Sequence, residues 1–154
     1  MKKFTNHIDH VAWISRYENL ERNLAELEAR ADTKLLRHEH SENGYVICAN
    51  WEAGLEVLSP LPHRTEYNAM MHDWLETKGE GVIFVAFGVT GLERHAARLE
   101  ALGIDVGPYF EDRSETPWRD QLVLRERTAG MVMNSVFVLA DIDYAEGIIP
   151  FGDA

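Results

Sequence analysis

Hydrophobic and polar positions in the first part of the chain predict a strand, a helix and three further strands. The first strand segment alternates in polarity, and Leu20, Leu24 and Leu27 then recur at the spacing of one helix face. Asn43-Gly44 is a strong hairpin signal, and Pro60 ends the series because proline cannot donate to a strand ladder. The predicted strands are residues 8–15, 33–40, 45–50 and 55–59, and the predicted helix is residues 18–30.

The second part of the chain repeats this order after a connector that contains its own helix. Gly103 is expected to stop the second long helix, and residues 128–130 are expected to form a turn between the last two strands. Residues 111–120 are polar and predicted to be a loop, and residues 141–154 show no strong period. The predicted helices are residues 68–77 and 92–102, and the predicted strands are residues 82–89, 104–110, 121–125 and 131–140.

An internal repeat accounts for this order. The strand segment HVAW at 10–13 precedes a helix at 20–29, and FVAF at 84–87 precedes a helix at 92–101, with seven of the ten helical positions identical. We therefore predict an α+β fold in which two tandem βαβββ modules form a curved mixed sheet around a central trough. The prediction is a single domain over residues 1–154, with modules at about 6–60 and 81–140, a connector at 61–80 and a tail at 141–154.

Composition narrows the classes of protein that fit. The chain has 154 residues, 45% of them hydrophobic, and a formal net charge of −11, which argues against a nucleic-acid partner. The single cysteine, Cys48, lies in an apolar run and is interpreted as a buried side chain rather than a nucleophile. No secretory signal or membrane-spanning stretch is recognised, so we expect a cytoplasmic protein with no membrane partner.

The repeat makes one difference between the modules informative: His10 in the first module corresponds to Phe84 in the second. Because side chains alternate across a strand, Ala12 shares the face of His10, and Ala86 shares the face of Phe84. Val11 and Trp13, on the other face of the first strand, are expected to pack on the helix. The small alanines leave room for a ligand beside His10 and Phe84.

Glu56 is an isolated carboxylate in an otherwise apolar strand. Its burial would cost several kcal/mol without a partner, so this side chain is expected to be exposed, paired or functional. Exposure is the commonest outcome, but two modules around one trough would bring the strands of His10 and Glu56 together.

Four segments resemble the vicinal oxygen chelate superfamily, which includes glyoxalase I, extradiol dioxygenases, bleomycin-resistance proteins and methylmalonyl-CoA epimerase. The strand ending in Ser-Pro, the helical linker and the Gly-Glu-Gly before a strand are most similar to the epimerase branch. The resemblance extends to about Ala140. The segments are residues 8–12 (IDHVA), 54–60 (GLEVLSP), 79–87 (GEGVIFVAF) and 129–134 (AGMVMN).

The resemblance implies a site for a divalent metal, with one ligand from each of four strands. His10 matches the first ligand and Glu56 the second, but Phe84 replaces the third and Asn134 the fourth. A phenyl ring offers no lone pair, and an amide oxygen is a poor donor to zinc, cobalt or nickel. We predict no tightly bound cofactor and at most a weak divalent metal held by His10 and Glu56. His38 and His40 share a strand face as two further candidate donors, although exposed strand histidines are the commoner interpretation.

Two functions follow from the resemblance. The narrowly preferred one is an epimerase-, isomerase- or lyase-like enzyme that transfers protons through Glu56 and His10 on a small carbonyl or carboxylate substrate, with acyl-CoA as one candidate. The alternative is a protein of the bleomycin-resistance type that sequesters a drug-like molecule without chemistry. A homodimer is implied by the resemblance. The predicted ligand-binding residues are Phe84, Asn134, Ala12, Ala86, Leu58 and Val132.

Overall fold

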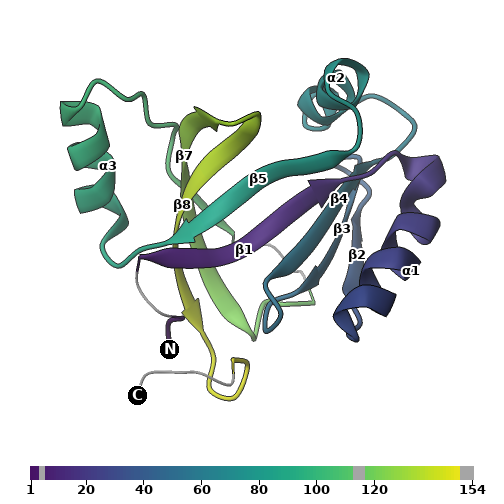
Figure 1. Ribbon diagram of the computed structural model, residues 1–154, viewed down its shortest axis with the longest axis horizontal. Coiled ribbons are helices and arrows are strands. Elements are labelled where there is room, and N and C mark those ends of the chain that lie inside the picture. Colours follow the sequence, from purple (N-terminus) through teal and green to yellow (C-terminus); the bar gives the residue numbers. More distant parts are fainter. Residues whose placement is uncertain (4–5, 113–116, 150–154) are drawn as a thin grey trace. The chain divides into compact units, whose positions relative to one another are not determined.

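The computed structural model describes residues 1–3, 6–112 and 117–149 (Figure 1). Within these ranges the chain forms a mixed eight-stranded sheet and three α-helices, which confirms the predicted α+β class. The strand order is β2-β3-β4-β1-β5-β8-β7-β6. Counted outward from its first strand, each half therefore has the same order, as the repeat predicts. None of the helices in these ranges is long and apolar enough to cross a membrane.

The chain divides into two compact units, which cut across the predicted modules. Residues 12–83 form one, named here the Glu56 unit, and residues 1–11 with 84–154 form the other, named the His10 unit. Strand β1 (His7–Ile14) and strand β5 (Gly81–Gly88) each contribute to both units.

The Glu56 unit packs helix α1 against one face of its strands. Leu20 and Leu24 of α1 lie in a buried cluster with Val46, Cys48 and Val57, and Trp13 packs against its edge, as predicted. Because Val57 faces α1, Glu56 and Leu58 point to the opposite face. The elements are a 3-10 turn (Tyr17–Asn19), α1 (Leu20–Ala31), β2 (Leu36–His40), β3 (Tyr45–Asn50), β4 (Leu55–Pro60) and α2 (Ala69–Thr77).

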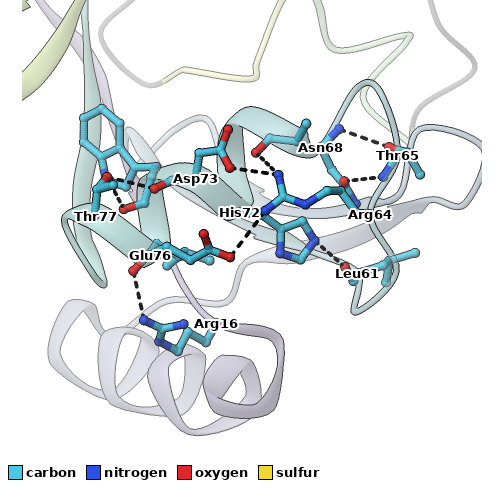
Figure 2. A network of polar contacts seen from close by, with 12 residues as sticks. Arg16, Leu61, Arg64, Thr65, Asn68, His72, Asp73, Glu76 and Thr77 are labelled. Atoms are coloured by element: carbon cyan, nitrogen blue, oxygen red, sulfur yellow. Dashed lines mark hydrogen bonds and ion pairs between the residues drawn. The ribbon is translucent and has the colours of Figure 1, made fainter.

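Asn68, just before α2, ties the connector to the β2–β3 turn. Figure 2 shows its hydrogen bonds with Thr65. Its Nδ2 donates to the carbonyl oxygens of Gly44 at 2.7 Å and His63 at 2.8 Å, and its Oδ1 accepts from the Thr65 amide at 2.7 Å. Gly44 has a φ of 80°, and a Cβ there would lie 2.7 Å from Asn68 Nδ2. The predicted Asn43-Gly44 turn and the helix after residue 68 are both confirmed.

The His10 unit buries the face of its strands that carries Phe87 and Leu139. Val89, Leu92, Ala129 and Leu139 form the buried cluster. Strand β5 pairs in parallel with β8, and β7 is antiparallel to both β6 and β8. Phe84 and Ala86 therefore lie on the opposite face of β5. The elements are α3 (Leu92–Ala101), β6 (Phe110–Asp112), β7 (Leu122–Val132) and β8 (Ser135–Tyr144).

The predicted turn at residues 128–130 is wrong. Strand β7 continues to Val132, and the hairpin turns at Met133 and Asn134, whose φ angles are 48° and 64°. Two consecutive positive φ angles form a turn whose twist suits a hairpin, and Asn tolerates them well. Gly130, with a φ of 75°, instead lies in the register irregularity between Thr128 and Met131. Its backbone freedom serves a bulge within the strand.

The strand predicted at residues 104–110 is also wrong, because only Phe110–Asp112 pairs as β6. Gly103, with a φ of 78°, ends α3, and the Ile104 amide bonds back to Leu99 O at 3.0 Å. Pro108 removes a further donor from this segment. The loop predicted at 111–120 thus includes part of β6, and its residues 113–116 lie outside the described chain. The tail predicted from residue 141 is strand to Tyr144, and its residues 150–154 also lie outside.

Candidate functional site

His10 is held in the His10 unit by the carboxylate of the residue before it. The imidazole is 1% exposed, and its Nδ1 lies 2.9 Å from Asp9 Oδ1. The same oxygen accepts a hydrogen bond from the Tyr144 hydroxyl at 2.7 Å. Lys3 adds its ammonium 3.7 Å from Asp9 Oδ1 and donates to the Asp9 carbonyl oxygen at 2.8 Å. Strand β1, strand β8 and the N-terminal segment thus meet at one buried carboxylate.

The surroundings keep Asp9 ionised. Burial acts to raise its pKa, but the hydrogen bond from His10, the charge of Lys3 and the hydrogen bond from Tyr144 together hold the pKa of Asp9 below its ordinary value. Burial also lowers the pKa of Lys3, against the pull of Asp9. An ionised carboxylate can only accept, so Nδ1 of His10 carries the proton. In the neutral ring the lone pair is then on Nε2.

Two further side chains of the His10 unit, Glu126 and Phe84, lie beside the imidazole. His10 Nε2 lies 3.8 Å from Glu126 Oε1, and the Phe84 ring meets the imidazole edge-on at a centroid distance of 5.7 Å and an angle of 78°. Glu126 was absent from the sequence prediction because the predicted strand stopped at Arg125. The available signal was alternation: Leu124, Glu126 and Thr128 share a face if β7 continues past residue 125.

The predicted ligand-binding residues of the His10 unit lie in two separate places, on strand β5 and at the hairpin between β7 and β8. Phe84 contacts His10, and Ala86 is buried two residues further along the same face of β5. Val132 ends β7 and is 47% exposed, while Asn134 is in the hairpin turn and is also exposed. In place of Asn134, the structure brings the carboxylate of Glu126 beside His10.

In the Glu56 unit, Glu56 is 4% exposed, so exposure is ruled out among the three outcomes considered from the sequence. Leu58 shares its face and is buried, as is Ala12 in β1. The rings of His38 and His40 lie 4.4 Å apart, with the His40 ring stacked on Tyr45 at 4.7 Å. The roles predicted for Glu56, Ala12 and Leu58 stay predictions.

No family model and no curated protein matches the sequence. Among solved structures, methylmalonyl-CoA epimerase from Mycobacterium tuberculosis matches with a TM-score of 0.60, 14% identity and coverage of 92% of both chains. A hypothetical protein from Bacillus halodurans matches with a TM-score of 0.64, 16% identity and coverage of 90% of this chain and 95% of the other.

A variant of Streptomyces coelicolor methylmalonyl-CoA epimerase in complex with 2-nitronate-propionyl-CoA matches with a TM-score of 0.59 and 17% identity, over 90% of this chain and 98% of the other. These epimerases belong to the vicinal oxygen chelate superfamily. The chain has the vicinal oxygen chelate fold. The resemblance inferred from sequence is confirmed at the level of the fold, which is as far as identities this low extend.

The vicinal oxygen chelate fold implies a divalent metal, so the donors of the His10 unit can be tested for fit. His10 Nε2 and Glu126 Oε1 supply one imidazole and one carboxylate, and Phe84 supplies none. Metal sites of this kind need at least three protein donors. Across the described ranges, no group of three His, Cys, Asp or Glu side chains is placed to hold an ion. Within the His10 unit, these two donors alone are therefore too few for a metal site of that kind.

Proposed function

We propose that this chain is an epimerase-like enzyme that moves a proton at the carbon next to a carbonyl group of a small substrate. The observation that carries the proposal is the fixed orientation of His10. Nδ1 is bound to the ionised Asp9, and Nε2 faces the Glu126 carboxylate at 3.8 Å. Acyl-CoA thioesters are the first substrate class to test, because one of the structural neighbours holds 2-nitronate-propionyl-CoA.

In this proposal Nε2 of His10 removes the proton. The C–H bond breaks, an N–H bond forms, and the electron pair moves onto the carbonyl oxygen as an enolate. The resulting imidazolium lies between two carboxylates, Asp9 at 2.9 Å and Glu126 at 3.8 Å, which favour its positive charge. Return of the proton to the opposite side of the carbon needs a second acid. Glu56, predicted from sequence as the catalytic partner of His10, is the residue proposed for that step.

Phe84 supports an acid–base site that does not depend on a tightly held ion. Its ring offers an apolar surface beside the imidazole, where a histidine ligand would be expected from the family. We propose that any divalent ion bound at His10 is weak. Elemental analysis of untagged protein is expected to find far less than one transition-metal ion per chain, and a stoichiometric tightly held ion would contradict this part of the proposal.

Solvent hydrogen exchange tests the function directly. Purified protein is incubated with a panel of acyl-CoAs and 2-oxo acids in D2O, and loss of the proton next to the carbonyl is followed by NMR. Replacement of a general acid–base group typically costs about 10²- to 10⁴-fold in rate, which is the loss expected for His10→Gln. Glu56→Gln is expected to retain exchange but lose inversion, and the exposed Glu18→Gln is the matched control.

Two results would overturn the proposal. One is exchange by His10→Gln at the rate of the wild-type protein. The other is tight binding of a panel member with no exchange at all, which would favour the sequestration function instead.

The homodimer expected from the resemblance stays a prediction, and sedimentation velocity measures it.

A further inference from the structure

The Glu56 unit contains a cavity on the side of its strands opposite to Glu56. It has a volume of about 340 Å³ and lies between α1, strands β1 and β4, and the start of β5. Trp13, Ile14, Leu27 and Val57 form its apolar lining. Val57 follows Glu56 along β4, so their side chains point to opposite faces. The cavity therefore lies on the α1 side, and its chemistry is independent of the proposed acid–base function. Its volume is in the range of small-molecule sites.

Glu80 places a carboxylate at the rim of this cavity. Its Oε1 accepts from Asn19 Nδ2 at 2.5 Å, its Oε2 accepts from Asn23 Nδ2, and the Ser15 hydroxyl lies 3.4 Å from Oε2. Asn23 also donates to Ser15 Oγ at 2.8 Å, which fixes its own orientation. All these donors are neutral, and within the described residues no Lys, Arg or His forms an ion pair with Glu80. The carboxylate is thus oriented while its negative charge is left uncompensated.

The remaining charges at the rim cancel each other. Arg30 and Glu26 both line the cavity and form an i,i+4 pair at 3.8 Å, with the Arg30 side chain 72% exposed. The net charge of the lining is therefore that of Glu80. A half-buried indole beside a carboxylate is a combination that attracts organic cations, because the ring face and the carboxylate both favour positive charge.

We propose that this cavity binds a small organic amine. Its ammonium group pairs with Glu80, and its apolar body lies against Trp13, Leu27 and Val57. The three apolar side chains select for an aromatic or branched aliphatic body, and the uncompensated carboxylate selects against anions and neutral molecules of the same shape.

Titration calorimetry with tryptamine and phenethylamine tests the proposal, with phenethyl alcohol and 3-phenylpropionate as neutral and anionic analogues. The amines are expected to bind at least about tenfold more tightly than either analogue. Glu80→Gln is expected to remove this preference. Glu26→Gln is the matched control, because it neutralises a carboxylate of the same rim that already has a cationic partner, and about a twofold change is expected.

A second variant keeps the test decisive if Glu80→Gln folds poorly. Leu27→Trp narrows the cavity and leaves the bonds of Glu80 to Asn19 and Asn23 in place, so it should weaken amine binding with no change in the circular dichroism spectrum. Equal affinity for amine and alcohol, or unchanged amine binding in Leu27→Trp, would overturn the proposal. So would absence of amine binding together with a change of oligomeric state in Leu27→Trp, since the cavity would then be an interface between copies of this chain.

Discussion

Replacing Asp9 with Asn tests the central contact of the His10 unit. Asp9 is buried and its carboxylate accepts from Tyr144 at 2.7 Å and from His10 at 2.9 Å. Hydrogen bonds to a charged group each contribute about 1.5–3 kcal/mol. Both donors reach the same oxygen, Oδ1, so Asn at this position offers them either a neutral oxygen or an NH2 group. Asp9→Asn therefore loses the charge that strengthens both bonds and the counter-charge of the half-buried Lys3. The free energy of unfolding is expected to fall by about 2–4 kcal/mol.

This difference should depend on pH in a defined direction. The pKa of Asp9 is lower in the folded chain than its ordinary value of about 3.9. Its contribution to stability is therefore present above about pH 4 and is lost as the pH falls through the folded pKa. Urea unfolding of wild type and Asp9→Asn from pH 7 to pH 3 should show two stabilities that differ at neutral pH and converge in acid.

The same variant also changes the proton position on His10. An amide can turn its NH2 group toward Nδ1, which favours the tautomer with the proton on Nε2 and removes the proposed base. Hydrogen exchange of the substrate should then fall at least about a hundredfold. Asp143→Asn is the matched control, since Asp143 is 42% exposed and pairs with Arg125 at 2.8 Å. Equal effects of the two variants on stability and rate would refute the reasoning.

Two further predictions concern residues outside the acid–base contacts. Burial raises the pKa of Cys48 to about 11, so only about one thiol in a thousand is ionised at pH 8, against about one in four for a free thiol. A disulfide reagent should modify Cys48 in the folded protein at least about 200-fold more slowly than in urea, and equal rates would contradict its burial. Asn134→Ala should destabilise the protein by about 1–2 kcal/mol because of the φ of 64°, whereas Asn134→Gly should be nearly neutral. Both variants should retain hydrogen-exchange activity, and a large loss in either would restore Asn134 to the site.

The architecture could be predicted from the sequence because each copy of the duplicated strand–helix unit contributes the residues of its own buried cluster. Leu20 and Leu24 of α1 and Leu92 of α3 are buried against their respective strands, and their helical spacing is visible in the sequence. Pairing of β2 with β3 and the turn before Tyr45 follow from Asn43-Gly44 and the strand alternation. These are local signals, which act over a few residues.

The hairpin between β7 and β8 was mispredicted because two turn signals compete there. Glycine has the stronger local preference for positive φ, so the sequence places the turn at Gly130. The positive φ of Met133 is unusual for a residue with a side chain. The bulge at Gly130 is determined by the pairing of β7 with β8, a contact between distant residues. This error of a few residues hid Glu126, because the predicted strand ended at Arg125, one residue before the carboxylate that lies 3.8 Å from His10 Nε2. The fourth site position was assigned to Asn134 by the family resemblance of residues 129–134.

The residues on the two faces of the strands differ in how far they repeat between the two halves of the chain. On the faces that pack against α1 and α3, apolar residues repeat between the halves, and their burial accounts for a fold shared at 14–17% identity. On the opposite faces the halves differ, with His10 in one and Phe84 in the other. A substitution there changes which atoms can accept a proton and leaves the core unchanged. The chemistry of this chain must therefore be sought where its two halves disagree, and similarity to the epimerases in the repeated core does not determine it.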